Sequence, residues 1–161
     1  MVKMEIREYS ISDNKAVAKL FDDFQDYLVA MDSFDILKRP DGFGKKYTEL
    51  TLKNISKNKG KMFVALRGAD MIGLIVAIVL PKSSDPGAKS GLRGRISELY
   101  LGKDHRGQGV GALLMKAGEG YLKQSGCKKI FIEVFTPNEG AHNFYKKFGY
   151  RDVDFEMVKD I

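Results

Sequence analysis

The chain has little of what builds disulfide scaffolds, metal clusters or membrane spans. Cys127 is its only cysteine, so neither an intrachain disulfide nor a cysteine metal cluster can form. Its two histidines, His105 and His142, lie far apart and lack the spacing of metal ligands. The longest apolar run, residues 71–80, is shorter than the roughly 20 residues that cross a bilayer, and the N-terminus has no signal-like apolar core. We therefore expect no metal, no membrane partner and a cytoplasmic protein.

Low-complexity runs, internal repeats and linkers are also absent from the 161 residues. The hydrophobic content of 43% and charged content of 30% are typical of a folded globular chain, which favours a single domain over residues 1–161. The net charge of +6 would permit nucleic-acid binding, but lysines and arginines are scattered rather than gathered among aromatic residues. A phosphate-rich cofactor explains such a surplus equally well, so nucleic acid is disfavoured as a partner.

A glycine-rich turn carries the clearest functional signal. Apolar residues at helical spacing follow it, which places the start of a helix at or just after Gly109. A helix N-terminus presents unpaired N–H groups and the positive end of the helix dipole, and glycines let a phosphate approach the backbone without meeting a Cβ atom. The turn therefore predicts a pyrophosphate site. It consists of Arg106, Gly107, Gln108, Gly109, Val110, Gly111 and Ala112.

Strand-like segments flank this turn and its helix at residues 95–101 and 129–135. Because a β-α-β crossover joins parallel strands, we expect these two to pair in parallel, with a pocket at their carboxyl ends. Before this unit we expect a strand over 2–9, a helix beginning at 12–13, a loop over 31–46 and a weaker helix over 47–57. Hairpin strands over 61–67 and 71–80 and a mobile connection over 81–94 should follow. After the unit we expect a helix opened by Thr136 and a last strand over 150–158.

Three interpretations of the glycine turn follow from the residues alone. A Walker A loop is excluded because the turn ends in Gly111-Ala112 instead of Gly-Lys-Ser/Thr. A dinucleotide fingerprint fits Gly107, Gly109 and Ala112 with Glu133 downstream, but too few strand–helix units follow for that fold. A glycine turn that binds no ligand is the remaining structural alternative.

Two motifs in the second half of the chain resemble one family. Residues 106–111 resemble the Q/R-x-x-G-x-G/A signature of the GNAT superfamily, the acyl-CoA-dependent N-acyltransferases. Residues 138–150 resemble that family's closing N-x-x-A-x-x-F-Y-x-x-x-G-F segment. The resemblance is close from Glu98 onward and covers the N-terminal half only in its order of elements. It implies a single-domain α/β (α+β) fold: a mixed, mostly antiparallel sheet with one parallel strand pair splayed around the CoA site, and helices on both faces.

The resemblance also implies an acetyl-CoA site. The glycine turn would take the pyrophosphate, and backbone groups near Tyr100 and Leu101 would bond the pantetheine amides as another strand would. Thr136 is the expected N-cap of the following helix, which leaves the Asn138 side chain free to meet the ligand. The expected cosubstrate-binding residues are Tyr100, Leu101, Arg106, Gly107, Gln108, Gly109, Val110, Gly111, Ala112 and Asn138.

The resemblance implies two catalytic residues, of which Glu98 lies near the family's usual carboxylate position. Glu98 is expected to deprotonate the amine through water, the alternative being a solvated strand residue. Tyr145 matches the family tyrosine that donates to the leaving sulfur, the alternative being a packing residue. Together they imply an N-acetyltransferase that moves acetyl from acetyl-CoA to a primary amine of a small molecule or peptide, by direct attack in a ternary complex. A catalytically inactive CoA-binding regulatory module is the alternative function, and a homodimer is compatible with both.

Acidic residues gather in the first helix and the loop after it, with no basic residue among them. Their simplest interpretation is a solvated helix face, whereas a patch of this kind beside a cleft would attract a cationic amine. The residues are Asp22, Asp23, Asp26, Asp32 and Asp35.

Overall fold

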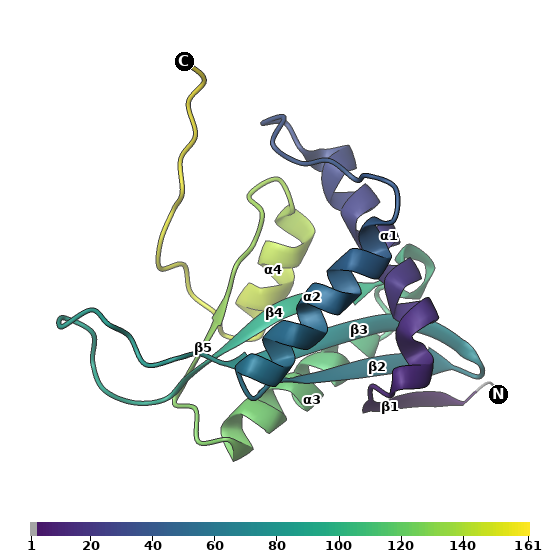
Figure 1. The fold of residues 1–161 in the computed structure, drawn as a ribbon, viewed down its shortest axis with the longest axis horizontal. Helices are drawn as coiled ribbons and strands as arrows, with labels where there is room; N and C mark the ends of the chain where they lie inside the picture. Colours follow the sequence, from purple (N-terminus) through teal and green to yellow (C-terminus); the bar gives the residue numbers. More distant parts are fainter. Residues whose placement is uncertain (1–2) are drawn as a thin grey trace.

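The computed structural model describes residues 3–161 and has a five-stranded sheet at its centre (Figure 1). In spatial as well as chain order, the strands are β1 (Met4–Glu8), β2 (Lys61–Arg67), β3 (Asp70–Val79), β4 (Arg93–Leu101) and β5 (Lys129–Ile132). The pairs from β1 to β4 are antiparallel, whereas β4 and β5 run parallel. This confirms the expected mixed sheet with one parallel pair.

Helices cover both faces of the sheet (Figure 1). One face carries α1 (Asn14–Met31) and α2 (Phe43–Lys57), the opposite face carries α3 (Val110–Gln124), and α4 (Glu139–Lys147) lies near β5. Short 3₁₀ helices, η1 (Ile11–Asp13) and η2 (Lys103–His105), precede α1 and α3. Within residues 3–161, no helix has both the length and the apolar character that a membrane span requires.

The core has two halves, one on each side of β3. Leu74 and Val76 pack with Phe21 of α1, whereas Ile75 and Ala77 pack with Leu114 of α3. These four β3 residues are fully buried, because successive side chains of a strand point to opposite faces and both faces are covered. The apolar run of β3 is thus explained by its place at the centre of the sheet.

α2 begins earlier than expected, because residues 43–46 are helical and not part of a loop. Glycine lowers helix propensity, which is why Gly42 and Gly44 indicated a loop. Gly42 lies just outside the helix, with a left-handed φ of 72° at the N-cap. Gly44 lies inside the helix. Glycine is required at this position because a Cβ atom would come within 2.0 Å of the Ala18 carbonyl oxygen of α1. Close packing of α1 against α2 therefore overrides propensity at this position.

The predicted last strand, residues 150–158, is wrong. This stretch contains neither helix nor strand, and the C-terminal segment that includes it runs away from the sheet in an extended path (Figure 1). Val153 and Phe155 are 71% and 80% exposed. Their alternation with acidic residues is typical of a strand, but a strand forms only against a partner in register, which local pattern does not provide. The predicted first strand is confirmed over Met4–Glu8, and Val2 lies outside the described residues.

The parallel pair separates toward its carboxyl end. β4 pairs with β5 only from Arg93, opposite Lys129, to Ile96, opposite Ile132. Beyond Ile96, β4 continues to Leu101, whereas β5 ends short of the expected residue 135. A bulge at Ser97 also bends β4, because Ile96 and Glu98 pair with adjacent residues of β3. The two strands therefore diverge where the site was expected.

Candidate active site

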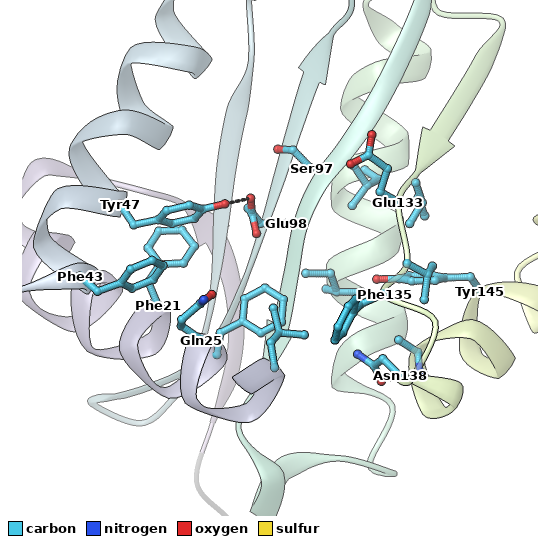
Figure 2. A pocket seen from close by; sticks show the side chains of 17 residues that line it. Phe21, Gln25, Phe43, Tyr47, Ser97, Glu98, Glu133, Phe135, Asn138 and Tyr145 are labelled. Atoms are coloured by element: carbon cyan, nitrogen blue, oxygen red, sulfur yellow. Dashed lines mark hydrogen bonds between the residues drawn. The ribbon is translucent and has the colours of Figure 1, made fainter. Parts of the chain in front are cut away.

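A pocket of about 270 Å³ lies at this divergence. Side chains of α1 and α2 form one wall, the ends of β4 and β5 form the middle, and the loop after β5 with α4 forms the other wall (Figure 2). Glu98 lines the middle of the pocket from β4, and Tyr145 lines the wall that α4 forms. The structure thus brings together the two residues that the sequence analysis selected as base and acid.

Glu98 is held by a tyrosine of α2. The Tyr47 hydroxyl donates a hydrogen bond of 2.6 Å to Glu98 Oε1 (Figure 2). Burial raises the pKa of Glu98 to about 7, with the charge of Glu133 acting in the same direction and the Tyr47 hydrogen bond opposing it. A carboxyl group with a pKa near neutrality exchanges a proton readily at neutral pH, as a general base must.

Tyr145 projects from α4 into the pocket. Its side chain is 8% exposed, and its ring packs edge-on against Phe144 and Tyr150. Burial, together with the charge of Glu98, raises the pKa of the Tyr145 hydroxyl to about 12. The hydroxyl points away from α4, toward the side of the pocket where Glu98 lies (Figure 2). The group is therefore a neutral hydrogen-bond donor at physiological pH.

The glycine turn opens α3 as expected, since the helix begins at Val110 with Gly109 at its N-cap. Gly107 and Gly109 have φ values of 72° and 80°, a left-handed conformation that side chains disfavour. A Cβ atom at either glycine would meet nothing within 4 Å, so the space above them is open. Gly111 has another role, because its Cβ would lie 3.3 Å from the Phe144 ring of α4. Its small size therefore lets α3 and α4 approach each other.

Two side chains of the turn bond to the protein itself. Arg106 Nε donates to the Leu101 carbonyl oxygen at 2.9 Å, and its guanidinium carbon lies 4.4 Å from the centre of the Tyr27 ring. Gln108 donates to the Asp104 carbonyl oxygen at 3.0 Å. The first N–H groups of α3 have no acceptor within the helix, as at any helix N-terminus. An anion placed at the turn would accept hydrogen bonds from these backbone groups.

The open edge of β4 presents backbone groups of Leu101, which was expected, and of Leu99 in place of Tyr100. Gly102 donates to the Ile72 carbonyl oxygen at 2.9 Å, so residue 102 bonds toward β3. Bonding direction alternates along an antiparallel strand, which turns Leu99 and Leu101 toward the divergence and Tyr100 toward β3. Leu99 was missed because alternation can be counted only once the register is known.

Asn138 lines the pocket but is also the N-cap of α4, which corrects the expectation that Thr136 caps this helix. Its Oδ1 accepts from the Ala141 N–H at 3.2 Å and from the Tyr27 hydroxyl at 3.4 Å. These bonds occupy the carbonyl side of the amide. The Nδ2 group is the part of Asn138 that a ligand could use as a donor.

A family model described as the acetyltransferase (GNAT) family matches residues 18–150. The chain belongs to this family. Among solved structures, a tetramutant of the BH1408 protein from Bacillus halodurans shares the fold with a TM-score of 0.84 and 22% identity, over 98% of this chain and 99% of that chain. The aminoglycoside N-acetyltransferase AAC(6')-Iy in complex with CoA shares it with a TM-score of 0.77 and 15% identity, over 100% and 96%.

Two curated relatives match this GNAT chain over part of their length. N-alpha-acetyltransferase 30 of Schizosaccharomyces pombe is 33% identical over 88 residues, which are 55% of this chain and 55% of the relative. The probable spermine N(1)-acetyltransferase of Bacillus subtilis subsp. natto is 28% identical over 100 residues, which are 57% of this chain and 64% of the relative. The chain thus spans about half to two thirds of these relatives.

The acidic residues of α1 in this GNAT chain are not a free anionic patch. Arg39, from the loop after α1, forms ion pairs with Asp26 and with Asp22, the latter at 3.7 Å. Lys19 pairs with Asp23 at 2.8 Å. Asp32 accepts hydrogen bonds from three backbone N–H groups of the following loop. The geometry therefore favours the interpretation as a solvated face and gives no support to attraction of a cationic amine.

The sequence analysis did not predict that α2 forms a wall of the pocket. Tyr47 is the residue of this wall that donates a hydrogen bond to Glu98. No local signal marks it, because Tyr47 meets Glu98 across 51 positions of sequence. The start of α2 was also placed too late to show that Phe43 and Tyr47 are one helical turn apart. Among residues 3–161, no three His, Cys, Asp or Glu side chains gather as metal ligands would.

Proposed function

We propose that this chain is an N-acetyltransferase that transfers the acetyl group of acetyl-CoA to a primary amine of a small molecule or peptide, by direct attack in a ternary complex. Membership of the GNAT family supports this, and so do the acetyltransferase activities after which its relatives are named. The observation that carries the proposal is the convergence of Glu98 and Tyr145 on one pocket at the open end of the parallel pair. Residues 1–161 would act as a single domain.

The residues present fit an acyl-CoA. The N–H groups at the start of α3 and the open space above Gly107 and Gly109 suit a pyrophosphate. The free edge of β4 at Leu99 and Leu101 suits the amides of a pantetheine arm, which would pair as an added strand does. Arg106 would have to exchange its bond to the Leu101 carbonyl for one to the ligand. The bound cosubstrate supplies the activated acetyl group.

Glu98 would take the proton that the amine must lose. An alkylammonium has a pKa of about 10, so only a small fraction is nucleophilic at neutral pH. The Glu98 carboxyl, with a pKa of about 7, can accept this proton through a water molecule and release it to solvent. The amine nitrogen then bonds to the acyl carbon, and N–H groups at the β4 edge stabilise the negative oxygen.

Tyr145 would act on the leaving sulfur as the carbon–sulfur bond breaks. A hydroxyl of pKa about 12 that gives its proton to a thiolate of pKa about 8.5 does so uphill by about 3.5 units, or roughly 5 kcal/mol. Full transfer is therefore costly, whereas a hydrogen bond to the developing thiolate has no such penalty. We assign Tyr145 as this donor, with the final proton coming from solvent.

Thiol release from acetyl-CoA, measured with a panel of amines, tests the proposal. The wild type should release CoA in an amine-dependent way and form the N-acetyl product. A regulatory module without catalysis would bind acetyl-CoA by calorimetry and release no thiol above the buffer rate. Glu98→Gln and Tyr145→Phe should keep cosubstrate affinity and lose rate, which separates a catalytic pocket from a binding pocket.

A further inference from the structure

We propose that the acceptor for this pocket is a small primary amine carried on one flat, apolar body, such as an aralkylamine, and not a polycation. The inference rests on the proposed N-acetyl transfer and deepens it by naming the acceptor class. It is drawn from the wall of the pocket that faces away from α4, since α4 and the β4 edge are the parts assigned to the cosubstrate.

That wall is aromatic. The Phe43 and Tyr47 rings of α2 stack at 5.1 Å with an angle of 15° between their planes. Phe21 of α1 meets Tyr47 edge-on at 4.9 Å. Figure 2 shows the three rings together on one side of Glu98, with Gln25 beside them. A flat apolar group placed against these rings loses contact with water and leaves its amine within reach of the carboxylate.

The charges around the pocket suit a single ammonium group. The carboxylates of its lining are Glu98 and Glu133. Glu133 is already paired with Arg95 at 2.6 Å, and its side chain is 81% exposed. Glu98 is thus the acid in the lining that has no cationic partner within the described residues. A second or third ammonium would lose its water shell without gaining a counter-charge, which is unfavourable.

The surface next to the aromatic wall gives a polycation no better contacts. Asp22 and Asp26, on the same helix as Phe21 and Gln25, are paired with Arg39 and offer no free counter-charge. The pocket volume of about 270 Å³ also falls just below the range of about 300–1,000 Å³ that holds drug-sized ligands. Both features favour a small acceptor with one charge.

The first test compares kcat/KM for 2-phenylethylamine, n-butylamine, spermine, kanamycin and a short peptide at saturating acetyl-CoA. We expect 2-phenylethylamine to exceed spermine, kanamycin and the peptide at least tenfold, and n-butylamine at least threefold. Preference for a polycation or for the peptide would overturn the inference and leave N-acetyl transfer intact. Absence of turnover with every amine would overturn both.

Two variants test the wall itself. Phe43→Leu keeps an apolar side chain but removes the ring, and should lower the ratio of kcat/KM for 2-phenylethylamine over n-butylamine at least fivefold. The same change in the exposed C-terminal segment, Phe155→Leu, is the control and should leave this ratio unchanged. An unchanged ratio in a folded Phe43→Leu protein would refute the aromatic subsite.

Gln25→Glu adds a carboxylate to the wall. This variant tests the charge argument, and its result is independent of the result for Phe43→Leu. It should raise kcat/KM for spermine at least fivefold relative to 2-phenylethylamine. Gln25→Met is the matched control, since both changes remove the hydrogen bond that Gln25 donates to the Lys38 carbonyl and only one adds charge. If the two variants treat spermine alike, the missing carboxylate is not what excludes polycations.

Discussion

Removing the Tyr47 hydroxyl should move the pH dependence of the reaction without changing its chemistry. Tyr47→Phe deletes the donor of the 2.6 Å hydrogen bond to Glu98 and keeps the ring between Phe21 and Phe43. The bond stabilises the ionised form of Glu98 and lowers its pKa. Its loss should therefore raise that pKa above about 7.

The magnitude follows from the strength of such a bond. A hydrogen bond to an ionised group contributes about 1.5–3 kcal/mol, and a pKa unit corresponds to about 1.4 kcal/mol. Because water will replace part of the lost bond, we expect a shift of about one unit. At pH 7 the ionised fraction of Glu98 would fall from about one half to about one tenth, so kcat/KM would drop about fivefold, and it would recover near pH 9.

The assay is kcat/KM against pH for the wild type and Tyr47→Phe with the same amine, so that the titration of the substrate cancels in the ratio. Tyr121→Phe makes the same chemical change where the hydroxyl donates to the Lys59 carbonyl, away from the pocket, and should leave the profile in place. A loss in Tyr47→Phe that is equal at every pH would refute the reasoning and assign Tyr47 a packing role alone.

Three further predictions concern charge, backbone and leaving group. Folding raises the pKa of Glu98 from 4.5 to about 7, so its contribution to stability is full below pH 4.5 and is lost as the pH rises through about 7. Urea unfolding of Glu98→Gln should accordingly show a gain over the wild type of up to about 3 kcal/mol at pH 9 and little at pH 4.5; an equal difference at both would contradict this. Gly109→Asn tolerates the left-handed φ of 80° but places a side chain where the pyrophosphate would lie, so calorimetric acetyl-CoA affinity should fall at least tenfold in a folded protein; undiminished affinity would move the site elsewhere. Tyr145→Phe should cut turnover about 10²-fold and regain part of it with an acyl donor whose thiol has a lower pKa; a wild-type rate when chemistry limits turnover would leave Tyr145 as a packing residue.

The glycine turn and its helix could be predicted from the sequence because their causes are local. The start of α3 at Val110 depends on apolar spacing and on glycines within the same few residues. The parallel pair follows from the chain order of strand, helix and strand, since a crossover connection permits little else. The motif that contains Tyr145 could be found from its own spacing. The family and the two residues assigned to catalysis came from these local patterns.

Other features depend on residues far apart in the chain, and only the tertiary structure decided them. Tyr47 reaches Glu98 because α2 packs against α1 and β3, beside β4, and Arg39 neutralises Asp22 and Asp26 because its loop folds back along α1. The direction of each backbone group on β4 depends on its register with β3. The periodicity of apolar residues identifies the buried face of a helix or strand, but it does not identify the element that will pack against and so cover that face. Charge pairing, strand register and the pKa of Glu98 are set by that covering, because desolvation and partners arise only on folding.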